Sequence, residues 1–104
     1  MIEIENDLNI VMDAEFEKGN FVILQFTSEL CDACSALEME LEDIEEDHND
    51  VSILSIDVSE NESAVEYYDV YQTPTMIIFN NQREVLFNGI GVMLSQDIEK
   101  LLGK

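Results

Sequence analysis

Two apolar runs separated by one amphipathic segment most constrain the fold of this chain. The first is FVILQF at residues 21–26, and the second is VSILSID at residues 51–57. Both are nearly continuous and rich in β-branched or aromatic side chains, which is typical of strands covered on both faces. Two such strands joined by a helix form a βαβ unit, in which the strands run parallel and the crossover is right-handed. The pattern therefore predicts an α/β fold.

The segment between the two runs is predicted to be a helix that begins at Cys31 and extends toward His48. Leu37, Leu41 and Ile44 recur at helical spacing and would face the sheet. The many acidic residues of this segment would form its solvated outer face. His48, near the C-terminal end, is expected to be a solvated residue favoured by the helix dipole.

The N-terminal residues predict a short edge strand followed by a helix. Ile2 and Ile4 alternate with glutamates, as in a half-exposed strand. Asn6 or Asp7 could then cap a helix that ends near Gly19.

The C-terminal half predicts two more helices and a hairpin. The expected elements are a short helix from Ser59 or Asn61 to about Tyr68, a hairpin of TMIIFN and REVLFN around a turn at 80–82, a chain break at Gly89 and Gly91, and a helix over 95–102. This order of elements predicts a central mixed β-sheet flanked by helices on both faces. A length of 104 residues with no linker or repeat predicts one domain, residues 1–104.

The charge balance narrows the classes of partner. The chain carries 24 acidic residues against 4 Lys and Arg, a net charge of -20. Nucleic acids and anionic membranes would both repel such a surface, so neither is an expected partner. Two interpretations of the charge stay open. In the first it serves solubility or adaptation to a salty habitat, and in the second it selects basic partners.

Neither a membrane anchor nor a secretion signal is expected from the sequence. The longest wholly apolar run is the four residues 21–24, far short of the ~20 that would span a bilayer. The first ten residues contain acidic residues and no Lys or Arg, whereas a signal peptide begins with basic residues. A cytoplasmic location is therefore expected.

The two cysteines of the chain, Cys31 and Cys34, carry its most specific chemical signal. In a reducing compartment such a pair favours redox chemistry or metal binding over a structural disulfide. Cys31 falls where a strand ends and a helix begins, so unpaired N–H groups and the helix dipole favour its thiolate. Cys34 lies one turn further on the same face, where it could resolve a mixed disulfide on Cys31. This arrangement predicts a two-step disulfide reductase, with Cys31 exposed and Cys34 shielded.

A zinc or iron–sulfur site is the alternative for this pair. Such sites need about four nitrogen or sulfur ligands, and beyond the two cysteines only His48 is available. Two copies of the chain sharing their pairs would be the remaining route. No metal is therefore expected.

The only proline adds a second motif. YDVYQTPT places Pro74 directly before the predicted strand TMIIFN, where an X-Pro bond can be cis in a tight turn. With a Cys-x-x-Cys after a central strand and a glycine before the last helix, the chain resembles the thioredoxin family over essentially its whole length. The matching positions are Cys31, Cys34, Thr73, Pro74, Thr75 and Gly91.

The resemblance implies a thioredoxin fold and a role for each matching residue. It implies that Cys31 is the nucleophile, that Cys34 is the resolving thiol, and that Pro74 is cis and packs beside them. It implies that the backbone of Thr73 pairs with a substrate strand. The implied rim of the docking surface consists of Leu30, Asp32, Ala33, Gly91 and Val92.

The implied activity is that of a thiol-disulfide oxidoreductase that reduces cytosolic partner proteins by cycling Cys31 and Cys34 between dithiol and disulfide. The implied partners are disulfide-containing proteins and an electron donor of the thioredoxin reductase type. If the net charge of -20 selects partners, basic proteins would be among them. No cofactor beyond the cysteine pair is implied, and the chain is expected to be a monomer.

The chain departs from the family pattern around its cysteines. Leu30 stands where thioredoxins usually have Trp, and Asp32-Ala33 where they usually have Gly-Pro. Gln25 and Ile53 replace a buried Asp and its Lys, so both members of a charged pair are absent together. These departures leave open a non-catalytic or weakly active binding module on the same fold. An oxidant or isomerase is a third class, but such relatives are usually exported and have His or aromatic residues between their cysteines.

Overall fold

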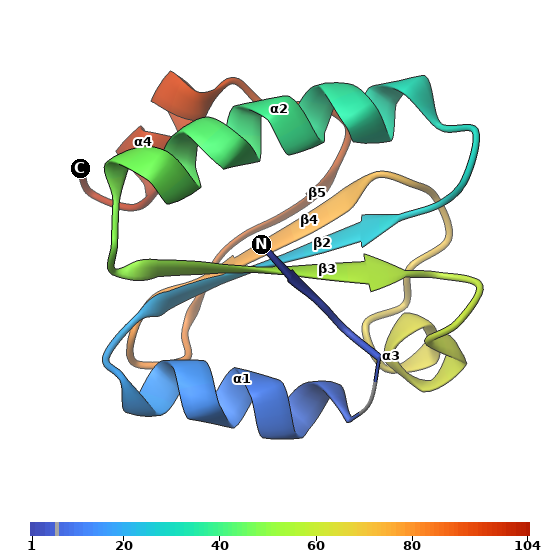
Figure 1. Ribbon diagram of the computed structural model, residues 1–104, viewed down its shortest axis with the longest axis horizontal. Helices are drawn as coiled ribbons and strands as arrows, with labels where there is room; N and C mark the ends of the chain where they lie inside the picture. The colour runs from blue at the N-terminus through green and yellow to red at the C-terminus, as the bar shows by residue number, and fades with distance from the viewer. Residues whose placement is uncertain (6) are drawn as a thin grey trace.

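The computed structural model describes residues 1–5 and 7–104, and within them five strands form one mixed sheet (Figure 1). The elements in chain order are β1 (Ile2–Glu3), α1 (Leu8–Glu17), β2 (Phe21–Thr27), α2 (Asp32–Asp47), β3 (Val51–Asp57), α3 (Glu62–Tyr67), β4 (Thr75–Phe79), β5 (Val85–Ile90) and α4 (Ser95–Leu101). The strand order is β1-β3-β2-β4-β5. β3 runs parallel to both β1 and β2, while β4 runs antiparallel to β2 and β5. The predicted βαβ unit, the hairpin and the mixed sheet are confirmed.

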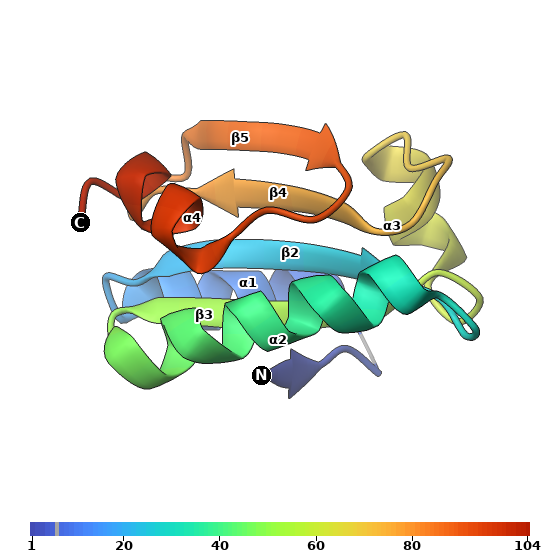
Figure 2. The same cartoon turned by 90° about the horizontal axis from the view of Figure 1, so that it is seen from above.

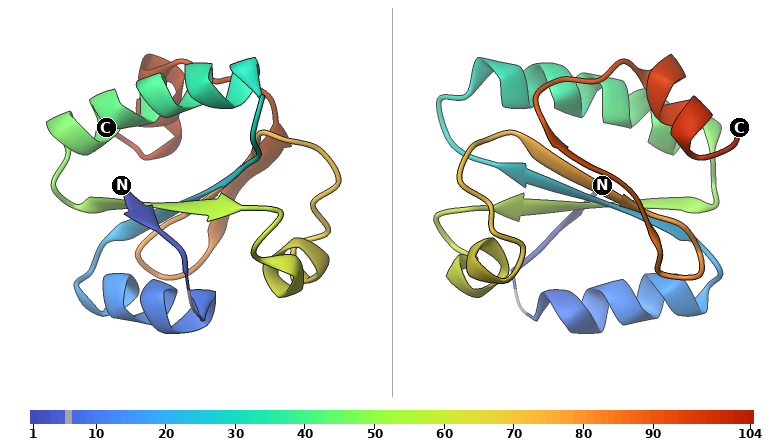
Figure 3. Two further views of the ribbon diagram at one scale, coloured as in Figure 1. Left: turned by 45° about the vertical axis from the view of Figure 1, so that its right-hand side comes forward. Right: turned by 180° about the vertical axis from the view of Figure 1, so that it is seen from behind.

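Helices cover both faces of the sheet, as expected. α2 and α4 lie on one face, and α1 and α3 lie on the other (Figures 1 and 2). Figure 3 shows the same layers from two further sides. None of the helices in the described part of the chain is long and apolar enough to cross a membrane.

The central strand β2 separates two hydrophobic clusters. Leu24 and Phe26 pack with α1 side chains on one face, and Ile23 packs with α2 side chains on the other. Residues 22–26 are all 0% exposed. Because complete burial of one large apolar side chain contributes about 1.5–3 kcal/mol, this strand anchors both halves of the core.

The ends of α1 follow from its sequence. Asp7 is the N-cap, and its carboxylate accepts the N–H of Asn9 at 2.9 Å. The other predicted cap, Asn6, lies outside the described residues. Gly19, just past the C-terminal end, has a φ of +84°, a left-handed conformation that glycine adopts without strain.

The position of β5 differs from the prediction. The strand begins at Val85, two residues later than expected, and continues through Gly89, which pairs with Met76 instead of breaking the chain. The reason for a glycine there is steric, because a Cβ would meet the Phe87 ring at 2.6 Å. Only Gly91, with a φ of 104°, turns the chain away from the strand.

Candidate active site

Cys31 stands at the junction between the central strand and the longest helix. Leu30, with a φ of 54°, turns the chain after β2, and Cys31 itself is extended as the N-cap of α2. Its Sγ accepts the backbone N–H of Cys34 at 3.2 Å, in the place where a capping oxygen usually lies. That N–H and the dipole of the 16-residue helix both stabilise negative charge on the sulfur. The junction therefore favours a thiolate at Cys31.

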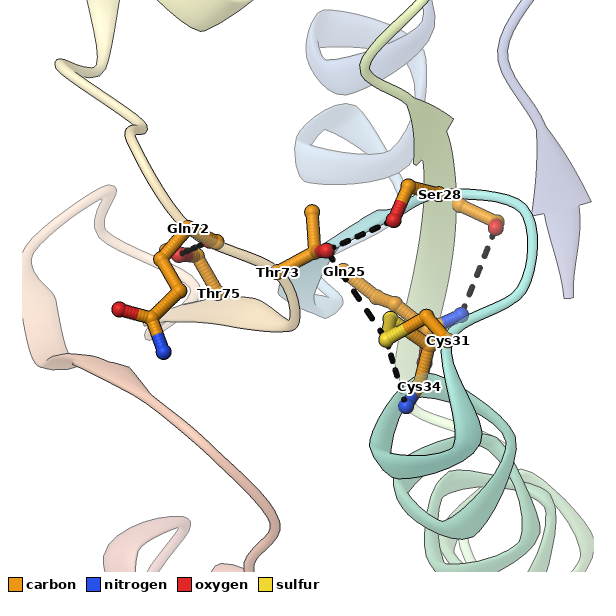
Figure 4. Close-up of a disulfide and its surroundings, with 8 residues drawn as sticks. Gln25, Ser28, Cys31, Cys34, Gln72, Thr73 and Thr75 are labelled. Atoms are coloured by element: carbon orange, nitrogen blue, oxygen red, sulfur yellow. Dashed lines mark hydrogen bonds between the residues drawn. A yellow bond between two sulfur atoms is a disulfide. The ribbon is translucent and has the colours of Figure 1, made fainter.

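Cys31 and Cys34 form a disulfide with their Cα atoms 5.2 Å apart (Figure 4). Cys31 is half-buried in this state, whereas Cys34 is only 3% exposed. The difference has the direction expected for an attacking and a resolving thiol. Reducing the pair would leave the Cys31 sulfur as the one that an external disulfide can reach.

The segment before β4 lies against the disulfide. The peptide bond between Thr73 and Pro74 is cis, and Pro74 is buried. Thr73 Oγ1 lies 3.9 Å from Cys31 Sγ and 2.7 Å from Ser28 Oγ (Figure 4). Either oxygen can be the donor in the hydrogen bond between the Ser28 and Thr73 hydroxyls. These residues meet because β2 and β4 are neighbours in the sheet.

Ser28 is a site residue that the sequence analysis does not identify. Its hydroxyl is hydrogen-bonded to that of Thr73, which in turn contacts the Cys31 sulfur. The only feature of the sequence that could have indicated Ser28 is its hydroxyl group in the turn between the central strand and the cysteines. That signal is weak, because serine is common in turns for other reasons.

The other expected rim residues come from two segments, one around the start of α2 and one after β5. Leu30 is fully exposed, and Asp32 and Ala33 are exposed in the first turn of α2. Gly91 donates its N–H to the carbonyl oxygen of Pro74 at 3.0 Å, and the next residue, Val92, is 46% exposed. The structure therefore joins the Gly91 segment to the cis-proline loop by a hydrogen bond. Leu30, Asp32 and Ala33 adjoin Cys31 through the chain itself.

The polar residue on the inner side of the site is Gln25, on β2. Its side chain is 0% exposed, and its Nε2 lies 3.4 Å from Ser55 Oγ and 3.5 Å from Met1 Sδ. Its Oε1 has no hydrogen-bond partner among the described residues. Ile53 on β3 is buried in the apolar cluster under α2. Neither position therefore carries a titratable side chain.

His48 has a structural contact instead of the expected solvated position. Its Nε2 lies 2.7 Å from Glu99 Oε2, which links the end of α2 to α4. The expectation that His48 is solvated is wrong, because its side chain is only 19% exposed and contacts Glu99 on α4. In the described part of the chain, no three His, Cys, Asp or Glu side chains are grouped so that they could hold a metal ion.

Comparisons with known proteins agree with this arrangement. A sequence model of the family Thioredoxin matches residues 7–103. The thioredoxin of Buchnera aphidicola subsp. Acyrthosiphon pisum is 27% identical over 103 residues, covering 93% of this chain and 94% of that protein. Among solved structures, chloroplastic thioredoxin z superposes with a TM-score of 0.83 at 23% identity, over 99% of this chain and 91% of that one. The thioredoxin of Fasciola hepatica superposes with a TM-score of 0.82 at 19% identity, over 99% of this chain and 97% of that one.

The family match explains the disulfide. Thioredoxins act through their own cysteine pair without a separate cofactor, and here that pair is Cys31–Cys34. The family implies disulfide-containing proteins as substrates and a thioredoxin reductase as a partner. A match that extends over almost the entire sequence, together with this fold and this redox-active pair, shows that the chain belongs to the thioredoxin family and is a protein-disulfide oxidoreductase.

Proposed function

We propose that this oxidoreductase acts as a reductase, with Cys31 as nucleophile and Cys34 as resolving thiol. The Cys31 thiolate attacks one sulfur of a partner's disulfide, which releases one partner thiolate and leaves a mixed disulfide. The Cys34 thiolate then attacks Cys31 Sγ, which releases the second partner thiolate and forms the Cys31–Cys34 disulfide. Two electrons pass to the partner, and a reductase of the thioredoxin reductase type returns two. The observation that carries this proposal is the Cys31 sulfur at the helix N-cap, accepting the Cys34 N–H.

Partner proteins are proposed to dock around the cis-proline loop. Thr73 would offer its backbone to an extended partner segment, which is a general mode of recognition by strand addition. Its side-chain contact with Cys31 Sγ supports this role, because a segment paired there would lie beside the reacting sulfur. The remaining surface would come from the exposed residues Leu30, Asp32, Ala33 and Val92 and from the half-buried Gly91.

The assay for this function is the reduction of insulin by dithiothreitol, which turns turbid when the free B chain precipitates. We expect the wild-type chain to accelerate turbidity and Cys31→Ser to abolish the acceleration. Cys34→Ser should accumulate a mixed disulfide that peptide mapping places on Cys31. If the wild-type chain binds partner proteins without reducing them, it is a binding module and the proposal fails. A mixed disulfide on Cys34 in Cys31→Ser, with none in Cys34→Ser, would reverse the two roles.

Basic proteins are the proposed preferred substrates. The net charge of -20 supports this choice, as do the exposed carboxylates of Glu29 and Asp32 on either side of Leu30–Cys31. Such a surface should accelerate association with basic proteins and slow association with acidic ones, within a Debye length of about 8 Å at physiological salt. Reduction rates of one basic and one acidic disulfide protein should therefore differ at low salt and converge at high salt. Equal reduction rates of the basic and the acidic protein at every salt concentration would contradict the proposed preference.

The proposed cellular location is the cytoplasm, and the proposed oligomeric state is a monomer. The support for the cytoplasm is that the only two cysteines form the redox pair, so none serves as a structural disulfide. Alkylation of intact cells followed by fractionation should recover the chain in the cytoplasmic fraction, mostly as the dithiol. Light scattering should give a mass close to 11.9 kDa. Recovery outside the cytoplasm, or twice this mass, would contradict the respective proposal.

A further inference from the structure

In the disulfide form, Oε1 of Gln25 is a buried polar atom without a hydrogen-bond partner among the described residues. This side chain is 0% exposed, and its Oε1 has no hydrogen-bond donor among the residues that the structure describes. Native proteins leave few buried polar atoms unpaired, because water can no longer compensate them. An acceptor in this position therefore suggests that a donor is present in another state of the protein.

Gln25 and Cys34 lie on the same side of the sheet. Side chains alternate along a strand, and Ile23 packs with α2, so Gln25, two residues later, also faces α2. On α2, Cys34 is the first of the buried residues that face the sheet, followed by Leu37 and Leu41. β2 ends next to the start of α2, and Figure 4 shows Gln25 behind the cysteine pair. The Gln25 side-chain amide therefore lies between β2 and α2, at the same end of the sheet as the buried Cys34.

Reduction creates a donor at this place. The disulfide has no S–H group, whereas reduction by two electrons and two protons, for example from two glutathione thiols, breaks the Sγ–Sγ bond and forms an S–H group on Cys34. The residues that flank Gln25 in the sheet are Ser55 and Met76, so neither neighbour can take that proton as a base. We propose that Gln25 is a positioning residue for the resolving thiol, whose Oε1 accepts a hydrogen bond from the Cys34 S–H in the dithiol state. The inference rests on the dithiol–disulfide cycle of the proposed function.

This hydrogen bond would bias the redox equilibrium. It exists only in the dithiol, so it stabilises the dithiol relative to the disulfide and raises the reduction potential of the pair. The net free energy of an intramolecular hydrogen bond corresponds to about a two- to tenfold change in an equilibrium constant. Tenfold equals about 30 mV for this two-electron couple.

The test is the equilibrium of the purified protein with reduced and oxidised glutathione at about pH 6, which is below the ordinary thiol pKa of about 8.5. Gln25→Leu should shift the equilibrium toward the disulfide by about two- to tenfold. Ile23→Val is the matched control, because it lies on the same strand, faces the same helix and is equally buried. It should leave the equilibrium unchanged even though it loses stability. No protein substrate takes part, so failure of the reductase proposal would not affect this measurement.

A second measurement needs no substitution of Gln25. The side-chain carbonyl ¹³C signal of Gln25 should shift between the disulfide and the dithiol of the wild-type chain. Cys34→Ala has no S–H, so its signal should stay near that of the disulfide form. The inference is overturned if the wild-type signal is the same in both redox states, if Gln25→Leu leaves the glutathione equilibrium unchanged, or if Ile23→Val shifts it equally.

Discussion

At the scale of single residues, reactivity depends on the groups next to the Cys31 sulfur. The N–H of Cys34 and the hydroxyl of Thr73 both donate toward it, and both favour the thiolate. Asp32 is next in the chain and exposed, and its carboxylate opposes a negative sulfur. Through solvent this repulsion is worth about 1 kcal/mol or less. The hydrogen bonds and the helix dipole should therefore prevail over it.

Removing that carboxylate should make Cys31 more reactive. We expect Asp32→Asn to raise the rate of iodoacetamide reaction with the reduced chain at pH 7 by about two- to fivefold, because more thiolate is present. Glu42→Gln removes another exposed carboxylate, far along α2, and should change the rate much less. A slower reaction of Asp32→Asn would mean that the carboxylate does not act by charge repulsion.

Much of the site at this scale could be predicted from sequence. The spacing of Cys31 and Cys34 after an apolar strand predicts their place at a helix N-terminus, and they are found there. Ser28 and the partner of His48 could not be predicted. Their contacts cross the fold, to Thr73 and Glu99, and depend on how segments 45 and 51 residues apart pack. Periodicity indicates which face of an element is buried, but not which side chain meets which.

At the scale of elements, the hairpin of β4 and β5 depends on an aromatic ring over a glycine. Gly89 lies two residues after Phe87 on β5, and the Phe87 ring lies only 2.6 Å from the place that a Gly89 Cβ would occupy. Phe87 also packs against the cluster under α2 and α4. The ring and the glycine should therefore contribute to stability together.

Gly89→Ala tests this dependence. Its Cβ would lie 2.6 Å from the Phe87 ring, so the ring must move, at a cost of about 1–3 kcal/mol in the free energy of unfolding. In a Phe87→Leu background the same change should cost much less, because the obstructing ring is absent. Urea unfolding of the four proteins measures both costs. Equal costs in the two backgrounds would show that the ring is not the obstacle.

The packing of α1 on β3 includes a buried carboxylate. Glu15 is 7% exposed, and its two carboxylate oxygens accept hydrogen bonds from Lys18 Nζ at 2.8 Å and Ser52 Oγ at 2.7 Å. Burial alone would raise the pKa of Glu15. The hydrogen bonds from Lys18 and Ser52 and the charge of Lys18 together outweigh burial and hold its pKa below the ordinary 4.5.

This lowered pKa makes the contribution of Glu15 depend on pH. A group whose pKa falls on folding stabilises the protein above its unfolded pKa, and that stabilisation is lost as the pH falls through the folded value. We expect Glu15→Gln to destabilise the chain by about 1–3 kcal/mol at pH 7. The deficit relative to wild type should shrink once the pH falls below the ordinary glutamate range. Urea unfolding at pH 7, 5 and 3 measures it, with the exposed Glu17→Gln as control. A deficit that does not vary with pH would contradict this assignment.

The order and type of the elements could be predicted because most of them have a clear period. Alternation or a continuous apolar run marks the strands, and helical spacing marks α1, α2 and α4. The start of β5 could not be predicted, because Arg83 adopts a left-handed turn with a φ of 66° and leaves Val85 as the first paired residue. The predicted break at Gly89 is wrong because the sequence does not reveal that Phe87 covers this glycine.

At the scale of the whole molecule, the net charge of -20 repels itself across a body only 31 × 28 × 20 Å in extent. One part of this repulsion lies on the outer face of α2. Glu42 is exposed there between Glu38 and Glu46, each four residues away. Like charges at this spacing destabilise a helix by a few tenths of a kcal/mol per pair.

Salt should therefore stabilise the chain by screening this repulsion. Glu42→Lys should also stabilise it, because it removes part of the same repulsion. We expect the free energy of unfolding of the wild type to rise between about 0.05 and 1 M NaCl, where the Debye length falls to about 3 Å. Glu42→Lys should be more stable than wild type at low salt and gain less from added salt. Urea unfolding over this range tests both statements. A wild-type stability that does not respond to NaCl would show that self-repulsion is negligible.

The central position of β2 has a consequence for hydrogen exchange. This strand pairs with β3 over residues 21–27 and with β4 over residues 22–26, and both clusters cover it. Its slowest amide protons should exchange with deuterium only when the whole molecule unfolds. Their exchange rates in the oxidised and the reduced protein then give two global stabilities. The difference between these stabilities is, by thermodynamic linkage, the free energy with which folding itself favours or opposes the Cys31–Cys34 bond.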